Sequence, residues 1–460
     1  MVTKSVWVVA YYFPPIATSG SMRPLGFCRY LGEYGWKPRV LTTDPECVYP
    51  PVGLDESVSD QILDTMQIDR VPHRNPERLL LHVRNMFREL LVQFHLLKEN
   101  QQVIRNGQSE ENLPAGFVRQ YLATRKAILA WLFSFPDRLC FWLRPAVQRF
   151  SRIPPKEYPN VVYATGGPWT SLLVGKALAE KLQVPFVADF RDPWTQNPNR
   201  QRFSAALFER HKRLEAAVCE SAVTVIANTD ELAAQFRRDY PGSDEKFITI
   251  TNGFDDGICA PAHDTGSRPF AAHTLAMELS HFGTVYGNRD PLPLMLALDS
   301  LFKENLIRGD QLRVRLIGDW LIENKESNIL AEKLEKIGLL YRSPSVAHNL
   351  CLEQMASAQV LLVLQPAYPL QVPAKIYEYI ATGRPIVVIG GEGATASLIE
   401  RFRLGEYCRN ESQAIKEFLL AMVNRQLRIR SPNPTTIKTF HYRHLTQKLA
   451  GVFDAVTAVN

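Results

Sequence analysis

Two successive series of short apolar segments constrain the fold of this chain more than any other feature of its sequence. Each segment is rich in Val, Ile and Phe, ends in Gly, Pro, Asn or Asp, and is separated from the next by a helical pattern. This alternation predicts parallel strands in α/β units, because strands that are buried on both faces read as continuous apolar runs. The first series includes residues 6–12, 38–42, 160–164, 185–189, 222–227 and 246–251, and the second includes residues 275–283, 313–318, 360–364 and 385–389.

The length of 460 residues favours the same division, because one hydrophobic core stops growing at about 250–300 residues. A turn-forming cluster at residues 252–257 separates the two series. We therefore predict an α/β fold of two doubly wound parallel-sheet domains. The predicted boundaries are residues 1–256 for the first domain, with a helical insertion at about 70–155, residues 257–433 for the second, and a closing helix within 434–460.

Composition excludes several classes of protein. Hydrophobic residues make up 46% and charged residues 22%, as in a folded globular protein rather than a disordered or collagen-like chain. The seven cysteines are scattered and form no C-x-x-C pair, which predicts a reducing compartment and no structural zinc. The first apolar run is too short for a signal peptide and no run is long enough to span a bilayer, so we expect a cytoplasmic protein.

The surplus of positive charge is concentrated in one stretch. Residues 70–152 hold 14 Lys and Arg against 6 Asp and Glu, interspersed with Trp and Phe at roughly helical spacing. Such helices suit an anionic membrane surface, which would make the protein peripheral to the inner face of the membrane. The alternative, which we favour, is that the aromatic residues pack against their own domain while the arginines are solvated. No nucleic-acid-binding motif accompanies the stretch, so we expect no nucleic-acid partner.

Loops at the carboxyl ends of parallel strands are where ligands bind in such folds. After the first predicted strand, Gly20 and Ser21 belong to a loop of small residues that leads into a helix, which allows backbone N–H groups to approach a ligand. Gly166 and Gly167 follow another strand and are predicted in the same cleft. Ordinary connecting loops and turns would have the same residues.

The segment Asp-Phe-Arg-Asp-Pro-Trp at residues 189–194 places three charges where an apolar strand has just ended. Asp189, Arg191 and Asp192 are our candidate catalytic residues, because two acids beside an arginine can orient a sugar hydroxyl or stabilise developing charge. The alternative is an Asp–Arg network that fixes the loop.

The second series opens with a glycine turn followed by a basic residue. Gly283 and Thr284 come directly after a strand, and Arg289 lies shortly beyond them. Arginine binds two oxygens of a diphosphate at once, so these residues are candidates for a loop that binds the diphosphate of a ligand. Gly318, after the next strand, is a candidate for the same site. The alternative is a solvated arginine beside a plain turn.

The segment from Ala374 to Pro385 carries the strongest signal. Ala374 and Lys375 are predicted at a helix start, where backbone N–H groups bind phosphate, and Glu378 stands one turn further on the same face. The Glu378 carboxylate is able to accept hydrogen bonds from both ribose hydroxyls, and Gly383 then ends the helix. The alternative is a surface Lys–Glu pair.

In order and spacing these segments resemble glycosyltransferase family 4, retaining enzymes with the GT-B fold. The matching residues are Tyr12-Phe13-Pro14-Pro15 with Arg23-Pro24, the segment from Asp189, Asn252-Gly253-Phe254-Asp255, Gly283-Thr284 with Arg289, and K-x-x-E-Y-x-A-x-G-x-P from Lys375. The resemblance implies an N-terminal acceptor-binding domain, whose cleft loops include Asn252, and a C-terminal domain that binds a nucleotide sugar without cofactor or obligatory metal. It also implies a final helix that crosses back to the first domain.

The resemblance assigns Glu378 to the ribose and Arg289 to the diphosphate, where the family usually has a lysine. The sequence departs from the family at three points. Thr284 replaces an arginine, Leu370 stands at the first glutamate of the E-x7-E pattern, and the usual active-site histidine is not evident. Contacts to the donor sugar are the part of the site that these changes affect.

The predicted function is metal-independent transfer of a hexose from a nucleotide diphosphate sugar to a glycan or lipid-linked glycan, in cell-surface polysaccharide or glycoconjugate synthesis. One alternative is an epimerase or hydrolase of the same fold that acts on the nucleotide sugar. Another is a non-catalytic partner of a second transferase that binds the nucleotide sugar. A dinucleotide oxidoreductase is disfavoured because the first strand lacks the fingerprint glycines.

Overall fold

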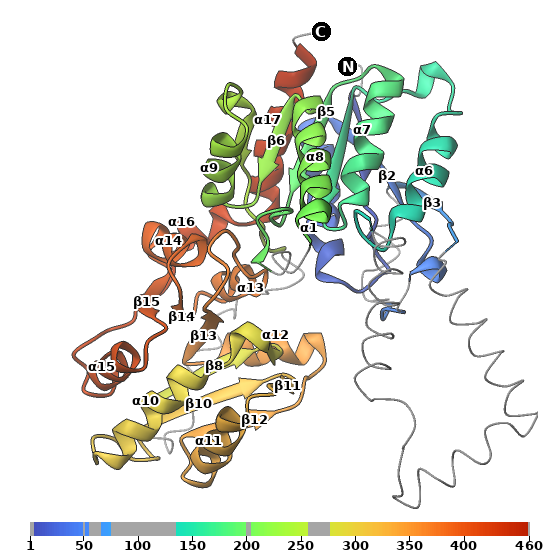
Figure 1. The fold of residues 1–460 in the computed structure, drawn as a ribbon. Helices are drawn as coiled ribbons and strands as arrows, with labels where there is room; N and C mark the ends of the chain where they lie inside the picture. Colours follow the sequence, from blue (N-terminus) through green and yellow to red (C-terminus); the bar gives the residue numbers. More distant parts are fainter. Residues whose placement is uncertain are drawn as a thin grey trace, which may run out of the picture. The chain divides into compact units, whose positions relative to one another are not determined.

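A computed structural model describes residues 4–48, 51–54, 66–74, 135–198, 204–255 and 277–458. These residues form two parallel sheets with helices on their faces, which confirms the predicted α/β fold class (Figure 1). Most of the predicted insertion, at 75–134, and the stretch at 256–276 lie outside the described residues.

The first sheet has seven strands in the order β3-β2-β1-β4-β5-β6-β7. The strands are β1 (Lys4–Val9), β2 (Trp36–Thr43), β3 (Gln67–Val71), β4 (Val161–Gly166), β5 (Phe186–Phe190), β6 (Thr224–Ala227) and β7 (Phe247–Thr249). In the centre of the sheet, Val8 lies opposite Val40 of β2 and Tyr163 of β4. All residues of β4 and β5 are buried, as continuous apolar runs predict for central parallel strands.

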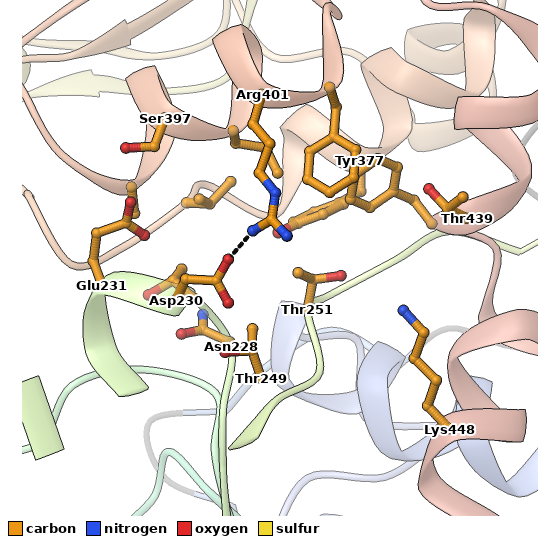
Figure 2. Close-up of a pocket in the computed structure, with 16 residues that line it drawn as sticks. Asn228, Asp230, Glu231, Thr249, Thr251, Tyr377, Ser397, Arg401, Thr439 and Lys448 are labelled. Atoms are coloured by element: carbon orange, nitrogen blue, oxygen red, sulfur yellow. Dashed lines mark hydrogen bonds and ion pairs between the residues drawn. The ribbon is translucent and has the colours of Figure 1, made fainter. Parts of the chain in front are cut away.

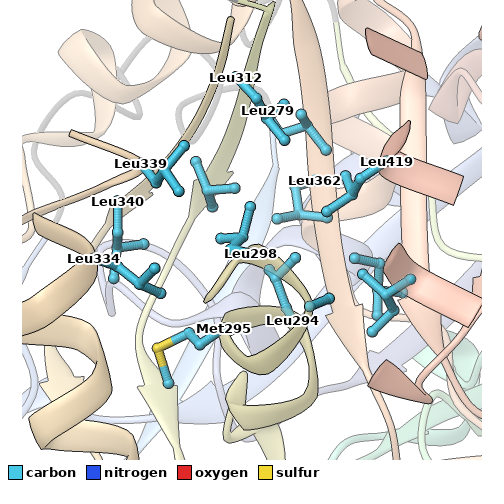
Figure 3. Packing of buried hydrophobic residues seen from close by; sticks show 14 of the residues in the cluster. Leu279, Leu294, Met295, Leu298, Leu312, Leu334, Leu339, Leu340, Leu362 and Leu419 are labelled. Atoms are coloured by element: carbon cyan, nitrogen blue, oxygen red, sulfur yellow. The ribbon is translucent and has the colours of Figure 1, made fainter. Parts of the chain in front are cut away.

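The second sheet has six strands in the order β12-β10-β8-β13-β14-β15. The strands are β8 (Met277–Phe282), β10 (Leu312–Ile317), β12 (Leu340–Ser343), β13 (Val360–Gln365), β14 (Ile386–Gly390) and β15 (Gly405–Arg409), and a separate short pair joins β9 (Val285–Tyr286) to β11 (Trp320–Leu321). Alternate residues of β13 enter two different cores. Leu362 and Leu364 pack with residues of α10, α11 and α15 (Figure 3), whereas Leu361 and Val363 pack with residues of α12, α13 and α14.

Thirteen helices are given bounds within the described residues. They are α1 (Ser19–Leu31), α6 (Leu143–Phe150), α7 (Thr170–Leu182), α8 (Ala205–Ser221), α9 (Asp230–Asp239), α10 (Leu292–Lys303), α11 (Lys325–Lys336), α12 (His348–Ser357), α13 (Lys375–Thr382), α14 (Ala394–Phe402), α15 (Ser412–Val423), α16 (Pro434–Thr439) and α17 (Tyr442–Ala458). Local signals account for several ends: the Thr229 hydroxyl accepts the Leu232 N–H at the start of α9, and Gly383 ends α13 with φ of 67°.

All ten predicted strands are present; the short pair of β9 and β11 was not predicted, nor were three further strands of the two large sheets. These are β3, β12 and β15, each at the edge of a sheet. Edge strands are covered less completely than central ones, and all three contain charged residues instead of a continuous apolar run. The pattern that identifies a central strand is therefore absent from them.

The contacts of the chain define two compact units. The first comprises residues 1–25, 35–189 and 217–223, and the second comprises residues 26–34, 190–216 and 224–460. The predicted domain boundaries after residues 256 and 433 stay predictions.

Within the second unit, the final helix packs on the end of α1. The ring of Tyr442 lies directly against Gly26 and 5.6 Å from the ring of Phe27, and its N–H donates to Phe254 O at 2.9 Å. A side chain on Gly26 would overlap this ring, so the glycine permits the close approach.

Candidate functional site

Two glycines at the carboxyl ends of β8 and β10 bring two loops into direct contact. Gly283 has φ of 127° and Gly318 has φ of 146°, a region that side-chain-bearing residues rarely adopt. A Cβ added to Gly318 would lie 2.5 Å from Gly283 O and 2.9 Å from Thr284 N. The absence of both side chains leaves bare backbone at this edge of the sheet, which suits close approach of a phosphate group.

Lys375, the first residue of α13, covers this glycine edge. Its amine donates to Phe282 O at 2.6 Å and lies 3.4 Å from His281 Nε2. A Cβ on Gly283 would overlap the amine. The amine therefore reaches the end of β8 only because the strand ends in glycine.

The protonation states around Lys375 follow from burial and neighbouring charge. The Nδ1 of His281 lies 3.0 Å from Leu362 O, and a carbonyl only accepts, so Nδ1 carries the proton and Nε2 faces the Lys375 amine with its lone pair. Burial, followed by the charge of Arg289, lowers the pKa of Lys375 to about 8, while Glu378 opposes this shift. Burial lowers the pKa of His281 well below its ordinary value, which keeps the imidazole neutral.

Arg289 is held by aromatic rings. Its guanidinium lies 5.2 Å from the ring centre of Tyr286 and 5.8 Å from that of Tyr368. Within the described part of the chain, the buried Nε of Arg289 has no hydrogen-bond partner. A half-buried guanidinium with an N–H group to donate is suited to a phosphate oxygen.

Glu378 lies three residues after Lys375, on the same helix, and is half-buried. Burial raises the pKa of its carboxyl, and the charges of His348 and Lys375 act in the opposite direction. The helix is fixed against β8 by Tyr379, whose buried hydroxyl accepts the Phe282 N–H at 2.9 Å. The carboxylate therefore projects from a rigid support.

The start of α13 has the predicted form. Ile376 N–H donates to Pro373 O at 3.0 Å and Tyr377 N–H donates to Ala374 O at 3.1 Å, so the N–H groups of Ala374 and Lys375 precede these first-turn bonds. Ala374 is exposed. Together with Gly283, Thr284, Arg289, Gly318 and Glu378, these residues form the predicted donor-binding set within the second unit.

The segment at 189–194 does not act as one cluster. Asp189 has no exposed surface, and its two oxygens accept from Arg23 Nε and Nη2 at 2.8 and 2.7 Å and from the Tyr163 hydroxyl at 2.7 Å. This arrangement matches the structural network that was the alternative for this residue. Its partner Arg23 is also buried.

The next two charged residues face a different environment. Asp192 Oδ1 accepts from Gln371 Nε2 at 2.9 Å, and Asn228 Nδ2 donates to the backbone oxygen of Arg191 at 2.5 Å. Gln371 follows Leu370 in the loop before α13, and Thr229 donates to Leu370 O at 2.9 Å. Asp192 is thus connected to the loop that precedes α13, the helix predicted to bind the donor, whereas the catalytic roles of Asp189, Arg191 and Asp192 stay predictions.

The remaining cleft residues are placed separately. Gly20 and Ser21 were predicted in a loop, but they lie in the first turn of α1, where the Ser21 hydroxyl donates to Ile16 O at 2.6 Å. Gly166 ends β4, and Gly167 follows it with φ of 96°. These four residues belong to the first unit, whereas Asn252, after β7, belongs to the second.

One protein family matches part of the chain. Residues 79–253 match the family described as a glycosyl transferase 4-like domain. The family resemblance drawn from the motifs is confirmed. No curated protein sequence matches the chain.

Solved structures extend the likeness to the whole chain. HepE of Anabaena, in complex with UDP and glucose, has 15% identity and a TM-score of 0.54 over 99% of this chain and 98% of its own. Sucrose-phosphate synthase from Thermosynechococcus elongatus has 12% identity and a TM-score of 0.60, over 99% and 100%. A Listeria monocytogenes protein assigned as a UDP-N-acetylglucosamine 2-epimerase has 9% identity and a TM-score of 0.53, over 100% and 97%. These likenesses confirm the GT-B fold.

Among the described residues, no group of three or more His, Cys, Asp and Glu side chains is arranged to hold a metal ion. No helix in the described ranges is both long and apolar enough to cross a membrane.

Sequence reasoning missed His281, Tyr368 and Gln371. A histidine in an apolar strand, two residues before Gly283, was the available signal for the first. Tyr368 and Gln371 lie in the loop before α13 and carry no local pattern, because their partners Arg289 and Asp192 are distant in sequence.

Proposed function

We propose that this protein transfers a sugar from a nucleotide diphosphate sugar to an acceptor, with retention of configuration. The observation that carries the proposal is that Lys375 lies on the glycine edge of the second sheet, with Arg289 and Glu378 as charged neighbours of its amine. Two cations, bare backbone and one carboxylate match the diphosphate and the ribose of such a donor.

In the proposed reaction, the main task of the site is to stabilise the diphosphate leaving group. As the bond from the sugar to the diphosphate breaks, negative charge builds on the diphosphate oxygens. Arg289, Lys375 and the N–H groups at the start of α13 neutralise that charge, and their fixed positions lower the barrier because they need no reorganisation. Glu378 orients the ribose, and retention requires no nucleophile from the protein.

Uridine is the base that the structural likeness favours for a first test. HepE is solved with UDP and glucose, and a second HepE structure contains UDP-glucose. We propose that the acceptor is a glycan or lipid-linked glycan in cell-surface polysaccharide synthesis, that Asp192 contributes to acceptor positioning, and that transfer needs no metal. We also propose a cytoplasmic location, with the basic aromatic stretch at 70–152 as a candidate membrane contact.

The direct test measures UDP release from UDP-sugars with and without an acceptor panel. Glu378→Ala and Arg289→Ala should each lower kcat/KM by at least about tenfold, corresponding to about 1.4 kcal/mol of lost stabilisation of the transition state. Lys336→Ala, at an exposed lysine of α11, is the matched control and should retain wild-type activity. Wild-type rates in both site variants would contradict the proposal.

The same assay separates the alternatives. An epimerase or hydrolase forms product without an acceptor. The similarity to the Listeria structure, which is assigned as an epimerase, is the reason to test this alternative. A non-catalytic partner binds UDP in calorimetry but releases none from UDP-sugars on any acceptor. Dependence of product formation on an acceptor is the result that the proposed transferase predicts.

A further inference from the structure

A cavity of about 360 Å³ lies within the second unit, apart from the donor-binding residues (Figure 2). Its walls come from the ends of β6 and β7, the start of α9, helices α13, α14 and α17, and the segment that joins α16 to α17. None of the residues predicted to bind the donor lines it. Its volume is within the range of about 300–1,000 Å³ that small-molecule sites occupy.

Aromatic rings form one part of the lining. Phe440 lies 4.9 Å from Phe402 and 5.7 Å from Tyr377, measured between ring centres. Tyr377 and Phe440 are almost completely buried, so their packing fixes this part of the wall. Phe402 is half-buried and is the one of these three rings with appreciable exposed surface, so its face is able to contact the apolar C–H face of a sugar.

Neutral polar groups form another part. The hydroxyls of Thr249, Thr251, Ser397 and Thr439 line the cavity. Asn228 also lines it, is only 1% exposed and donates through Nδ2 to Arg191 O. Its Oδ1 accepts no hydrogen bond from any described residue. A buried amide oxygen without a donor costs free energy, and a ligand hydroxyl would satisfy it.

The charges around the cavity balance. Lys448 and Arg401 contribute two positive charges, and Asp230 and Glu231 contribute two negative ones. Arg401 is already paired with Asp230 at the exposed rim, as the dashed line in Figure 2 marks. A strongly anionic or cationic ligand therefore gains little here, whereas an uncharged ligand rich in hydroxyls matches the lining.

We propose that this cavity is a second binding site, which takes an uncharged saccharide of one or two rings. The Phe402 ring would contact the C–H face of the sugar, and Asn228 and the hydroxyl-bearing side chains would bind its hydroxyls. The site is separate from the donor-binding set, so it does not depend on the proposed function. Tyr377 nevertheless belongs to the helix that carries Lys375 and Glu378, so an occupied cavity contacts the support of the donor site.

The test is saturation-transfer NMR on the full chain with glucose, galactose, N-acetylglucosamine, maltose and sucrose. Ser397→Trp places an indole in the cavity from an exposed position of α14. Glu400→Trp, at an exposed residue of the same helix that does not line the cavity, is the matched control. We expect at least one saccharide to bind the wild type and the control equally, and to bind Ser397→Trp at least about tenfold more weakly.

A second variant helps to distinguish loss of saccharide binding from misfolding of the protein. Lys448→Met removes the amine of an exposed residue of α17 while keeping most of its volume, and should weaken the same saccharide. UDP binding, measured on every variant, reports whether the donor site is intact. The proposal is overturned if no saccharide of the panel binds the wild type, if both cavity variants bind as the wild type does, or if inorganic phosphate displaces the saccharide.

Discussion

Raising the pH from about 7 to about 9 should weaken the binding of a nucleotide diphosphate sugar through loss of the proton on Lys375. Burial and the charge of Arg289 lower the pKa of this amine to about 8. About nine tenths of the amines are therefore protonated at pH of about 7, and about one tenth at pH of about 9. The protonated form, which attracts the anion, is present below the pKa and is lost above it.

The expected loss of affinity is about tenfold over this range, or about 1.4 kcal/mol, if the diphosphate binds only the charged amine. Calorimetry with UDP-glucose is the suitable assay, because both phosphates of this ligand stay ionised throughout the range. The Lys375→Arg variant stays charged at every pH up to about 12, so its affinity should not change between pH of about 7 and about 9. Lys336→Arg, at an exposed lysine of α11, should leave the wild-type profile unchanged.

Two results would refute this reasoning. The first is a wild-type affinity that stays constant between pH of about 7 and about 9. The second is a decline of equal size in Lys375→Arg, which would assign the titration to another group.

Three further predictions concern the backbone, the buried ion pair and metal dependence. Gly318→Ala should lose UDP binding and at least about 3 kcal/mol of unfolding free energy, because its Cβ would lie 2.5 Å from Gly283 O at φ of 146°. Gly287→Ala, with φ of 46° and open space around it, should cost only about 1–2 kcal/mol in the same urea titration, and equal losses would contradict the close-approach argument. Asp189→Ala leaves the buried Arg23 without its carboxylate and should cost about 3–5 kcal/mol, whereas a loss below about 1 kcal/mol would show that the pair is not structural. Treatment with EDTA should leave sugar transfer unchanged, and activity that is lost and then restored by Mg²⁺ would contradict the proposed metal independence.

Local patterns in the sequence predicted the central strands and helix α13. Lys375 and Glu378 lie three residues apart on one helix, so their shared face follows from helical geometry alone. Gly383 ended that helix as predicted, because a left-handed residue is needed there. The glycine ends of β8 and β10 were also predictable as loops.

Contacts between distant residues were not predictable in the same way. Arg23 and Asp189 are 166 positions apart, and nothing in the local pattern of either residue identifies the other as its buried partner. The contact between Arg289 and the Tyr368 ring joins two loops that are distant in sequence, and so does the hydrogen bond from Gln371 to Asp192. The cavity near Tyr377 is lined by segments from residue 228 to residue 448, so only the folded chain reveals it.

A crystal structure of the protein with UDP tests the central claim most directly. The account predicts diphosphate oxygens within hydrogen-bonding distance of Arg289 and Lys375, against the backbone of Gly283 and Thr284, and ribose hydroxyls on the carboxylate of Glu378. A nucleotide bound elsewhere, for example in the cavity beside Tyr377, would contradict it.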